Sequence, residues 1–185
     1  MKKRKNFLIS NLYNSLNKTS KGTILRSVAV FIAIEFCGSI LTGRTGNGTT
    51  RLNFKEFCES KYLSKKYHRV SDLLYLIFRN GVAHSYLAKG GALLTSSKNA
   101  INGHFKFLNS GLLIYVPVFA QDVQVAIKKL YKDIKTNKNN LRINYEKIIQ
   151  DLHNTGMKFY KDYIKRNKIR PRNIPVRGDM IINIL

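Results

Sequence analysis

The sequence predicts a mainly α-helical domain: a helical bundle with a small antiparallel β-hairpin or three-stranded insertion around residues 92–118. Long segments repeat apolar residues at helical spacing, and only the insertion loses that period. A chain of 185 residues is long enough for one domain with a full core. We therefore expect one domain at 21–165, a basic amphipathic arm at 1–20 and a basic tail with two prolines at 166–185.

The most apolar stretch covers residues 24–41. Arg26 and Glu35 interrupt it, so its uncharged run is far below the roughly 20 residues that a membrane span needs. We therefore expect a helix of the protein core and no membrane partner. Cys37 and Cys58 have no CxxC partner, which indicates neither a zinc site nor a disulfide framework. Such thiols fit the reducing cytoplasm.

Residues 42–53 contain three glycines and no large apolar residue before Leu52, which predicts a loop. Glycines and arginines together can bring backbone amides and guanidinium groups to a phosphate. The Gly-Lys-Ser/Thr of a Walker loop is missing, however, and no strand precedes the stretch. Two interpretations remain: a plain connection between helices, which we favour, and an RNA contact through Arg44 and Arg51.

A short helix is expected over residues 54–63. The residues that follow it crowd positive charge before the next helix, at Lys65, Lys66 and Arg69. Tyr62 and Tyr67 are interleaved with these cations, and aromatic rings beside basic groups are typical of surfaces that stack on bases. The pattern predicts an RNA contact; the alternative is a solvated charged face.

Residues 71–91, SDLLYLIFRNGVAHSYLAKGG, predict one buried helix with Ser71 as its N-cap. Its apolar residues form two stripes that leave little of the circumference for water. Arg79, Asn80 and His84 are the polar exceptions. Asn80 and His84 stack on one face, whereas ideal geometry separates Arg79 from His84 by about 7.5 Å along the axis and roughly 140° around it. Two copies of the helix side by side would bring these groups together better than one.

The helical period is lost after this helix. Residues 92–95, 104–108 and 112–118 look like short strands separated by Asn-Gly and Asn-Ser-Gly turn signals. We predict a small antiparallel hairpin or a three-stranded sheet. His104 lies in the second of these strands, where we expect a surface residue rather than a ligand.

Two amphipathic helices are expected at 119–134 and 145–165, with a polar break between them. In the first, three lysines lie on an outward face: Lys128, Lys129 and Lys132. In the second, the inward stripe is made by Ile148, Ile149, Leu152, Phe159 and Tyr163. For the tail at 166–185 three interpretations stay open: a partly ordered terminus, which we favour, a strap on a partner subunit, or an RNA-binding segment.

The polar residues of the central helix give the pattern R-x4-H, with Asn80 directly after Arg79 and His84 at its end; Tyr86 extends it to R-x4-H-x-Y. This pattern resembles the signature of HEPN domains, small helical domains that often act as ribonucleases. The longer form looks like the motif of HEPN toxins that are paired with nucleotidyltransferase antitoxins. The resemblance covers residues 20–165, and the strand-like segment departs from a plain HEPN bundle.

The resemblance implies a metal-independent endoribonuclease, a toxin or a defence component. RNA can be cut without a metal because its 2′-hydroxyl is the nucleophile; the cut needs a base, an acid and a cation on the developing charge. His84 would act as acid or base, Arg79 would hold the scissile phosphate, and Asn80 would orient one of them. One histidine does not easily supply both proton transfers, which favours a homodimer, the form in which HEPN ribonucleases are known.

Two alternatives concern the same helix. Tyr86 is either a core or interface residue or, if the toxin resemblance is close, the hydroxyl that a cognate nucleotidyltransferase antitoxin modifies with AMP. Asn80 and His84 are either catalytic or a satisfied polar pair within the bundle, with Arg79 capping carbonyls or paired to Asp72. In the second case the protein is a non-catalytic RNA-binding or regulatory HEPN-like module.

The charge of the chain points to a polyanionic partner. Lys and Arg number 33 against 10 Asp and Glu, a formal charge of +23. Such a field suits RNA first and an anionic membrane second, although a coding bias toward Lys and Asn accounts for part of it. A basic structural protein bound to nucleic acid is therefore a third interpretation. The few acids form no DxD or HExxH pattern, so we expect no metal site and no cofactor.

Overall fold

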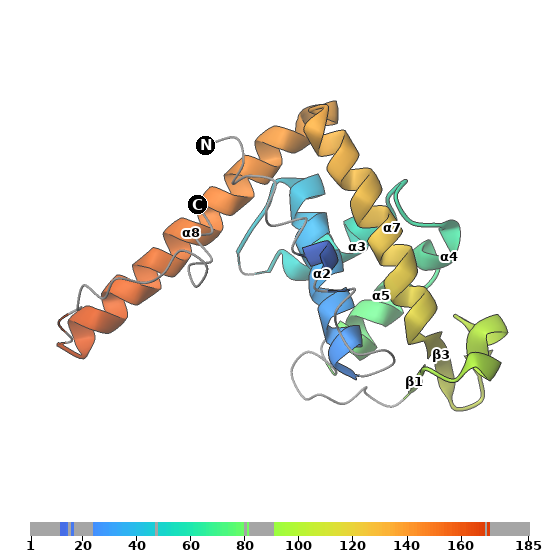
Figure 1. The fold of residues 1–185 in the computed structure, drawn as a ribbon. Coiled ribbons are helices and arrows are strands. Elements are labelled where there is room, and N and C mark those ends of the chain that lie inside the picture. The colour runs from blue at the N-terminus through green and yellow to red at the C-terminus, as the bar shows by residue number, and fades with distance from the viewer. Residues whose placement is uncertain are drawn as a thin grey trace.

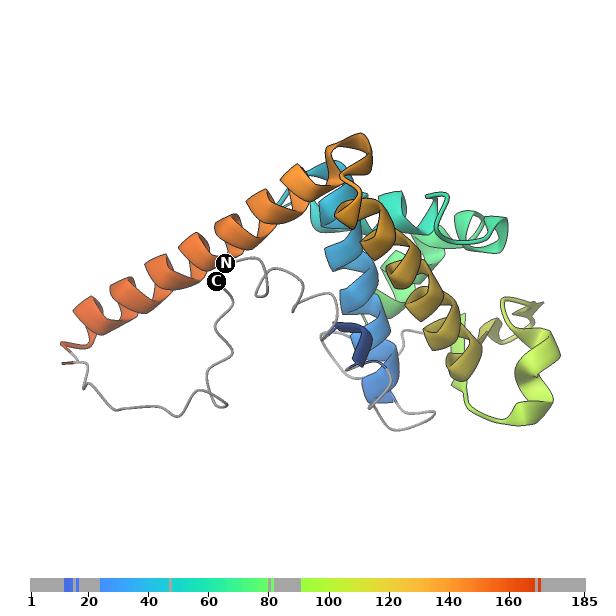
Figure 2. The same cartoon turned by 45° about the horizontal axis from the view of Figure 1, so that its top comes forward.

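The computed structural model describes residues 12–14, 16, 24–46, 48–79, 81, 91–168 and 170. Over these residues the chain is mainly helical with a small three-stranded sheet, which confirms the predicted class. Figure 1 shows α2, α3 and α7 gathered into one bundle, the sheet beside the beginning of α7, and α8 extending away from the bundle. Figure 2 shows the same projection of α8 from a second direction.

The helices and strands have the following bounds. The α-helices are α2 (Ile24–Thr42), α3 (Thr50–Cys58), α4 (Lys65–His68), α5 (Ser71–Leu73), α7 (Val116–Lys135) and α8 (Leu141–Arg166). The other helical segments are the π-helix η1 (Leu74–Arg79) and the 3₁₀-helices η2 (Lys98–Gly103) and η3 (Lys138–Asn140). The strands are β1 (Gly91–Thr95), β2 (Phe107–Leu108) and β3 (Gly111–Tyr115).

Helix α2 is the centre of the core. By length and composition it is apolar enough to cross a membrane, yet half of that window is buried inside the domain. Phe31 packs with its ring centroid 5.8 Å from that of Phe54 on α3 and 5.4 Å from that of Phe119 on α7. Leu16, from the predicted N-terminal arm, is fully buried in the same core. The core-helix prediction for this stretch is therefore confirmed.

Close contact between α2 and α3 depends on a glycine. A Cβ at Gly38 would lie 1.7 Å from the carbonyl oxygen of Asn53, so no other residue fits there without moving the backbone. Asn53 is buried and ties down the loop that joins the two helices. Its Oδ1 accepts from Thr42 Oγ1 at 2.7 Å, and its Nδ2 donates to the Arg44 carbonyl at 3.2 Å. The predicted glycine-rich loop is present, and Gly46 has a φ of +103° there.

The central helix differs from the prediction in two ways. Its N-cap position is Val70 rather than Ser71, and the Ser71 hydroxyl bonds Glu59, directly after α3, and the His68 carbonyl instead of capping the helix. From Leu74 to Arg79 the helix winds as a π-helix. Leu74 is fully buried, but Leu76 is 45% exposed, so the described part of this helix is buried on one side only. Residues 80 and 82–90 lie outside the described residues, and Gly91, predicted to end the helix, begins β1.

The sheet is mixed, with the strand order β1-β3-β2. β2 and β3 are antiparallel around a tight turn, as predicted, whereas β1 pairs with β3 in parallel from Gly91↔Gly111 to Thr95↔Tyr115. The predicted three-stranded sheet is present, and β1 joins it in parallel because the chain crosses over through η2 and β2 before it returns as β3. Parallel pairing needs a crossover of this kind, about a dozen residues or more.

Helices α7 and α8 begin three or four residues earlier than predicted. Pro117 belongs to the first turn of α7 rather than to the end of a strand, because a first-turn residue needs no N–H donor. The outward basic face of α7 is confirmed. The inward stripe predicted for α8 holds only at its beginning: Ile148 is buried, but Leu152, Phe159 and Tyr163 are 47%, 69% and 62% exposed.

Candidate functional site

The central helix carries the predicted catalytic motif. Arg79 is the last residue of η1, the segment that winds as a π-helix. Short π-helical segments inside α-helices occur frequently at functional sites. The Arg79 side chain lies outside the described residues, as do Asn80, His84 and Tyr86. The roles assigned to these four residues therefore stay predictions, and the geometry that follows concerns their surroundings.

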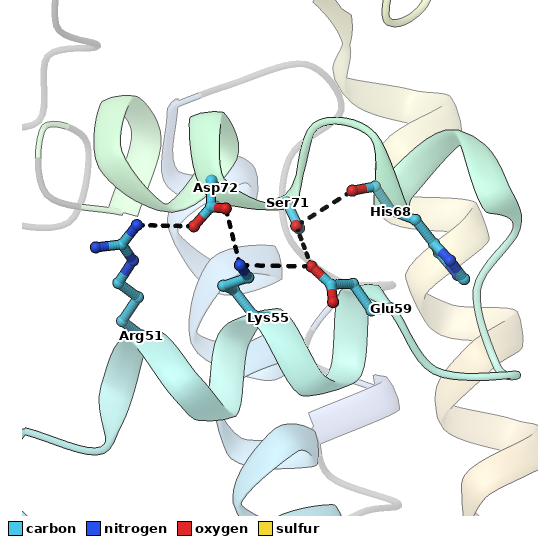
Figure 3. Close-up of polar contacts among 6 residues, drawn as sticks. All are labelled: Arg51, Lys55, Glu59, His68, Ser71 and Asp72. Atoms are coloured by element: carbon cyan, nitrogen blue, oxygen red, sulfur yellow. Dashed lines mark hydrogen bonds and ion pairs between the residues drawn. The ribbon is translucent and has the colours of Figure 1, made fainter.

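A network of polar contacts fixes the start of the central helix against α3 (Figure 3). The Asp72 carboxylate accepts hydrogen bonds from Arg51 Nη2 at 2.9 Å and from Lys55 Nζ at 2.8 Å. Ser71 Oγ donates to Glu59 Oε1 at 2.6 Å, and Lys55 Nζ lies 3.8 Å from the same oxygen. Two cations and two carboxylates therefore neutralise one another along one line, which we call the α3–α5 seam.

The α3–α5 seam fixes the positions of its charged side chains but adds little to the stability of the fold. Hydrogen bonds from Lys55 and then Arg51 lower the pKa of Asp72 below its ordinary value, and the hydrogen bond to Asp72 raises the pKa of Lys55. The side chains remain open to water, with Arg51 53% and Asp72 48% exposed. Exposed ion pairs contribute little to stability because water and salt screen them. Their effect here is to hold α5 in place and to occupy two cations.

The five cations predicted to contact RNA fall into two groups. Arg51 is occupied at the α3–α5 seam, and Lys66 Nζ lies 2.7 Å from Asp122 Oδ2. The remaining three are exposed and have no acidic partner among the described residues: Arg44, Lys65 and Arg69. The second group is free to meet a phosphate without breaking an internal ion pair.

Tyr62 and Tyr67 are not available to stack on bases. Both are core residues, 6% and 0% exposed. Each hydroxyl donates to an acid of α7: Tyr62 to Asp133 at 2.9 Å and Tyr67 to Asp122 at 2.7 Å. Burial, followed by the bond to Asp133, raises the pKa of Tyr62 to about 12. The stacking prediction was wrong because these rings point into the bundle while the neighbouring lysines point out.

An open cleft of about 700 Å³ lies where the sheet meets α7, and we call it the α7 cleft. β1 and β3 are parallel, so both strands end at the same edge of the sheet, with Thr95 opposite Tyr115. From one end the chain continues into Ser96 and η2, and from the other into α7. An antiparallel pairing of β1 with β3 would have placed these two ends at opposite edges.

The α7 cleft gathers positive charge. Its cations are Arg26 of α2, Lys98 of η2 and Lys128 of α7, and none of the described residues that line it is acidic. Tyr13 and Tyr115 add aromatic rings, and the Lys128 ammonium lies 4.6 Å from the centre of the Tyr13 ring. The sequence gives no signal for this site, because its three cations are far apart along the chain and only the fold brings them together.

His104 supports the strand end at the cleft. Its Nδ1 accepts from the Tyr115 backbone N–H at 3.2 Å, and its ring stacks on Phe105 at 3.9 Å between centroids. Burial lowers the pKa of His104 to about 4; Lys66 adds to this shift and Asp122 opposes it. The surface-strand prediction for His104 was wrong, because the residue is half-buried in a turn before β2.

No other reactive centre is found in the described part of the chain. Cys37 and Cys58 are free thiols in the core, and burial raises the pKa of each, so neither is suited to act as a nucleophile. Within the same residues there is no group of three His, Cys, Asp or Glu side chains that would hold a metal ion. The clusters of exposed cations are therefore the feature of the described residues for which a function has to be proposed.

Comparison of the chain with protein-family models, curated proteins and solved structures finds no match. The HEPN resemblance therefore rests on the motif of the central helix and on its helical surroundings. A function for this chain has to be argued from its own residues.

Proposed function

We propose that this protein binds RNA and cleaves it as a metal-independent endoribonuclease of the HEPN type. The observation that carries the RNA part is the charge. With 33 Lys and Arg against 10 Asp and Glu, at least 23 cations have no acid of their own. Several of those acids are already held in internal pairs, at the α3–α5 seam and at Asp122 and Asp133. A chain with such an excess gains from binding a polyanion, because the phosphates offset its self-repulsion.

The catalytic part rests on the motif. Arg79 would neutralise the charge that develops on the scissile phosphate, and His84 would move a proton to or from the reacting oxygens. Asn80 would orient the histidine or the phosphate. Two features support this assignment: the π-helical winding that ends at Arg79, and the α3–α5 seam that holds the same helix at its start.

The assembly and setting belong to the same proposal. Because one histidine does not easily supply both proton transfers, we propose a homodimer that brings two motifs to one cleft. We also propose that it acts in the cytoplasm as a toxin or defence component. Its partner is then a cognate nucleotidyltransferase antitoxin that modifies Tyr86 with AMP.

Cleavage without metal is the test. The purified protein is expected to cut RNA in EDTA and to leave 2′,3′-cyclic phosphate or 3′-phosphate ends. His84→Ala and Arg79→Ala are each expected to lower the cleavage rate by about a hundredfold or more, because an acid–base group or an oxyanion cation is lost. RNA binding should stay nearly intact. His68→Ala, at an exposed histidine outside the motif, is the matched control and should cut at the parental rate.

A non-catalytic RNA-binding protein is the second candidate. The observation in its favour is that Arg44, Lys65 and Arg69 are exposed and can bind phosphates without any residue of the motif. Binding with a steep salt dependence and no cleavage by the parent would select this candidate. If both motif variants cut as fast as the parent, the endoribonuclease proposal is lost.

A further inference from the structure

The α7 cleft is a feature of the described residues that the proposed function does not use. Its volume of about 700 Å³ lies within the range of small-ligand sites, roughly 300–1,000 Å³. It is lined by Tyr13, by Arg26 of α2, by the segment after β1, and by the segment that runs from the end of β3 into α7. A cleft built by so many elements has a shape set by the fold rather than by one mobile side chain.

The charge of the cleft selects an anion. Arg26, Lys98 and Lys128 approach it from three different elements, and none of the described lining residues is an acid. Like charges that face one another repel, and a ligand with more than one negative charge removes that repulsion. Arginine and lysine are the side chains that bind phosphate in proteins, the first as a planar fork and the second as a point charge.

The rest of the lining suits a nucleobase. Tyr13 is partly exposed and supplies an aromatic ring, and rings of this kind stack on bases whatever their sequence. Gln121 is exposed in the cleft, and a side-chain amide has both the donor and the acceptor that a base edge requires. Tyr115 and Gln124 also line the cleft, but they are buried, with 7% and 8% of their surface exposed, and belong to its wall. A simple inorganic anion would use only the cations, whereas a nucleotide would use all three kinds of group.

We propose that the α7 cleft binds a nucleotide, with its phosphate held by the exposed lysines Lys98 and Lys128. The nucleotide is either a free mononucleotide or one unit of an RNA strand. The second source rests on the proposed RNA function, and the first does not. The site is distinct from the motif of the central helix, since none of its lining residues belongs to that motif.

The test compares two neighbouring lysines of α7. Lys128 lines the cleft, whereas Lys129 is equally exposed and does not line it. Lys128→Glu and Lys129→Glu change the net charge by the same amount, so they alter the long-range field alike. Binding of AMP and of a short single-stranded RNA is measured by calorimetry on the full-length chain. Lys128→Glu is expected to weaken binding about tenfold to a hundredfold, and Lys129→Glu less than about twofold.

A second pair of variants guards against a local effect of Lys128. Lys98→Glu removes a cleft cation from η2, and Lys106→Glu is its control at an exposed lysine outside the cleft. The same contrast is expected for this pair. Thermal unfolding of all four variants is measured beside the parent, and it should show the same midpoint, because each substituted side chain is exposed.

Each outcome has one meaning. Loss of AMP binding in the two cleft variants alone supports the free mononucleotide as the ligand. Loss of RNA binding in those variants, with no AMP binding by the parent, supports the RNA strand. Equal effects in cleft and control variants, or no binding of either probe by the parent, overturn the inference. If the binding effects are equal in cleft and control variants while RNA cleavage persists in all four, the inference about the cleft fails and the proposed function still stands.

Discussion

Arg51 and Lys55 on α3 face the carboxylate of Asp72, whereas Lys98 and Lys128 face a cleft that no described acid lines. Both groups are cations on a very basic chain, and both lie partly open to water. The first group is matched by acids within hydrogen-bonding distance and serves to position the central helix. Lys98 and Lys128 are not matched by acids in the cleft, so bringing these two positive charges to the same cleft is favourable only when an anion is bound there. The position of acids, rather than the count of lysines, therefore separates structural cations from candidate binding cations.

The contact between α2 and α3 positions both groups, and breaking it should give the largest effect. Gly38→Ala would place a Cβ 1.7 Å from a backbone oxygen of α3, which no side-chain rotation relieves. We expect a loss of about 3 kcal/mol in the free energy of unfolding, measured by urea denaturation. Since α2 contributes to the wall of the α7 cleft, any variant that still folds should also bind AMP less well.

Gly156→Ala is the control for that experiment. Gly156 lies within α8, and a Cβ there would meet nothing within 4 Å. The substitution should stabilise the protein by about 0.5–1 kcal/mol, because alanine loses less backbone freedom than glycine in a helix. Similar changes in both glycine variants would show that α2 and α3 do not approach as closely as the structure places them.

The strand end at the α7 cleft depends on His104, which must stay neutral to accept a hydrogen bond. His104 Nδ1 accepts the Tyr115 N–H, and burial lowers the pKa of His104 from 6.5 to about 4. In the unfolded chain His104 takes up a proton below about pH 6.5, so its contribution is complete above that pH and is lost as the pH falls toward 4. Allowing for partial exposure, we expect a loss of about 1–2 kcal/mol across this window.

Replacing the histidine isolates this effect. The free energy of unfolding is measured at pH 7 and at pH 4.5 for the parent and for His104→Gln, whose side chain keeps an acceptor but does not titrate. The parent should lose about 1–2 kcal/mol more than the variant. His68→Gln, at an exposed histidine, should keep the parental pH dependence. A parental profile in His104→Gln would mean that His104 is not buried in a neutral form.

Local patterns in the sequence predicted local features. The apolar composition of residues 24–41 predicted α2, and the lysines of α7 were correctly placed on its outer face by their helical spacing. The same period failed for the second half of α8, where Phe159 and Tyr163 are exposed. Periodicity indicates which residues share a face, but it carries no information about whether another element covers that face.

Features made by distant segments were not predictable in this way. The short apolar runs of β1 and β3 are compatible with either direction of pairing, so their parallel arrangement, and with it the α7 cleft, did not follow from the sequence. Ser71 was predicted to cap its own helix because serine favours that position, but Glu59 of α3 offered its hydroxyl a charged acceptor. The motif from Arg79 to Tyr86 was found by its spacing, and its chemistry stays a prediction.

The smallest effect, and the most direct test of the comparison, is the release of structural cations at the α3–α5 seam. Asp72→Asn removes the carboxylate that Arg51 and Lys55 share, with only a small loss of stability because the pair is exposed. The freed cations would then resemble those of the α7 cleft and become available to phosphate. We therefore expect tighter RNA binding, with the slope of log affinity against log salt steeper by about 1.

A matched acid on the same helix separates release of a cation from a change in overall charge. Glu56 is exposed on α3 and has no ion-pair partner among the described residues, so Glu56→Gln adds the same net charge without freeing a lysine or an arginine. Its salt slope should equal that of the parent. If both variants steepened the salt slope by the same amount, Arg51 and Lys55 would already leave their carboxylates to bind RNA phosphates in the parent. The distinction between structural and binding cations would then have no physical basis.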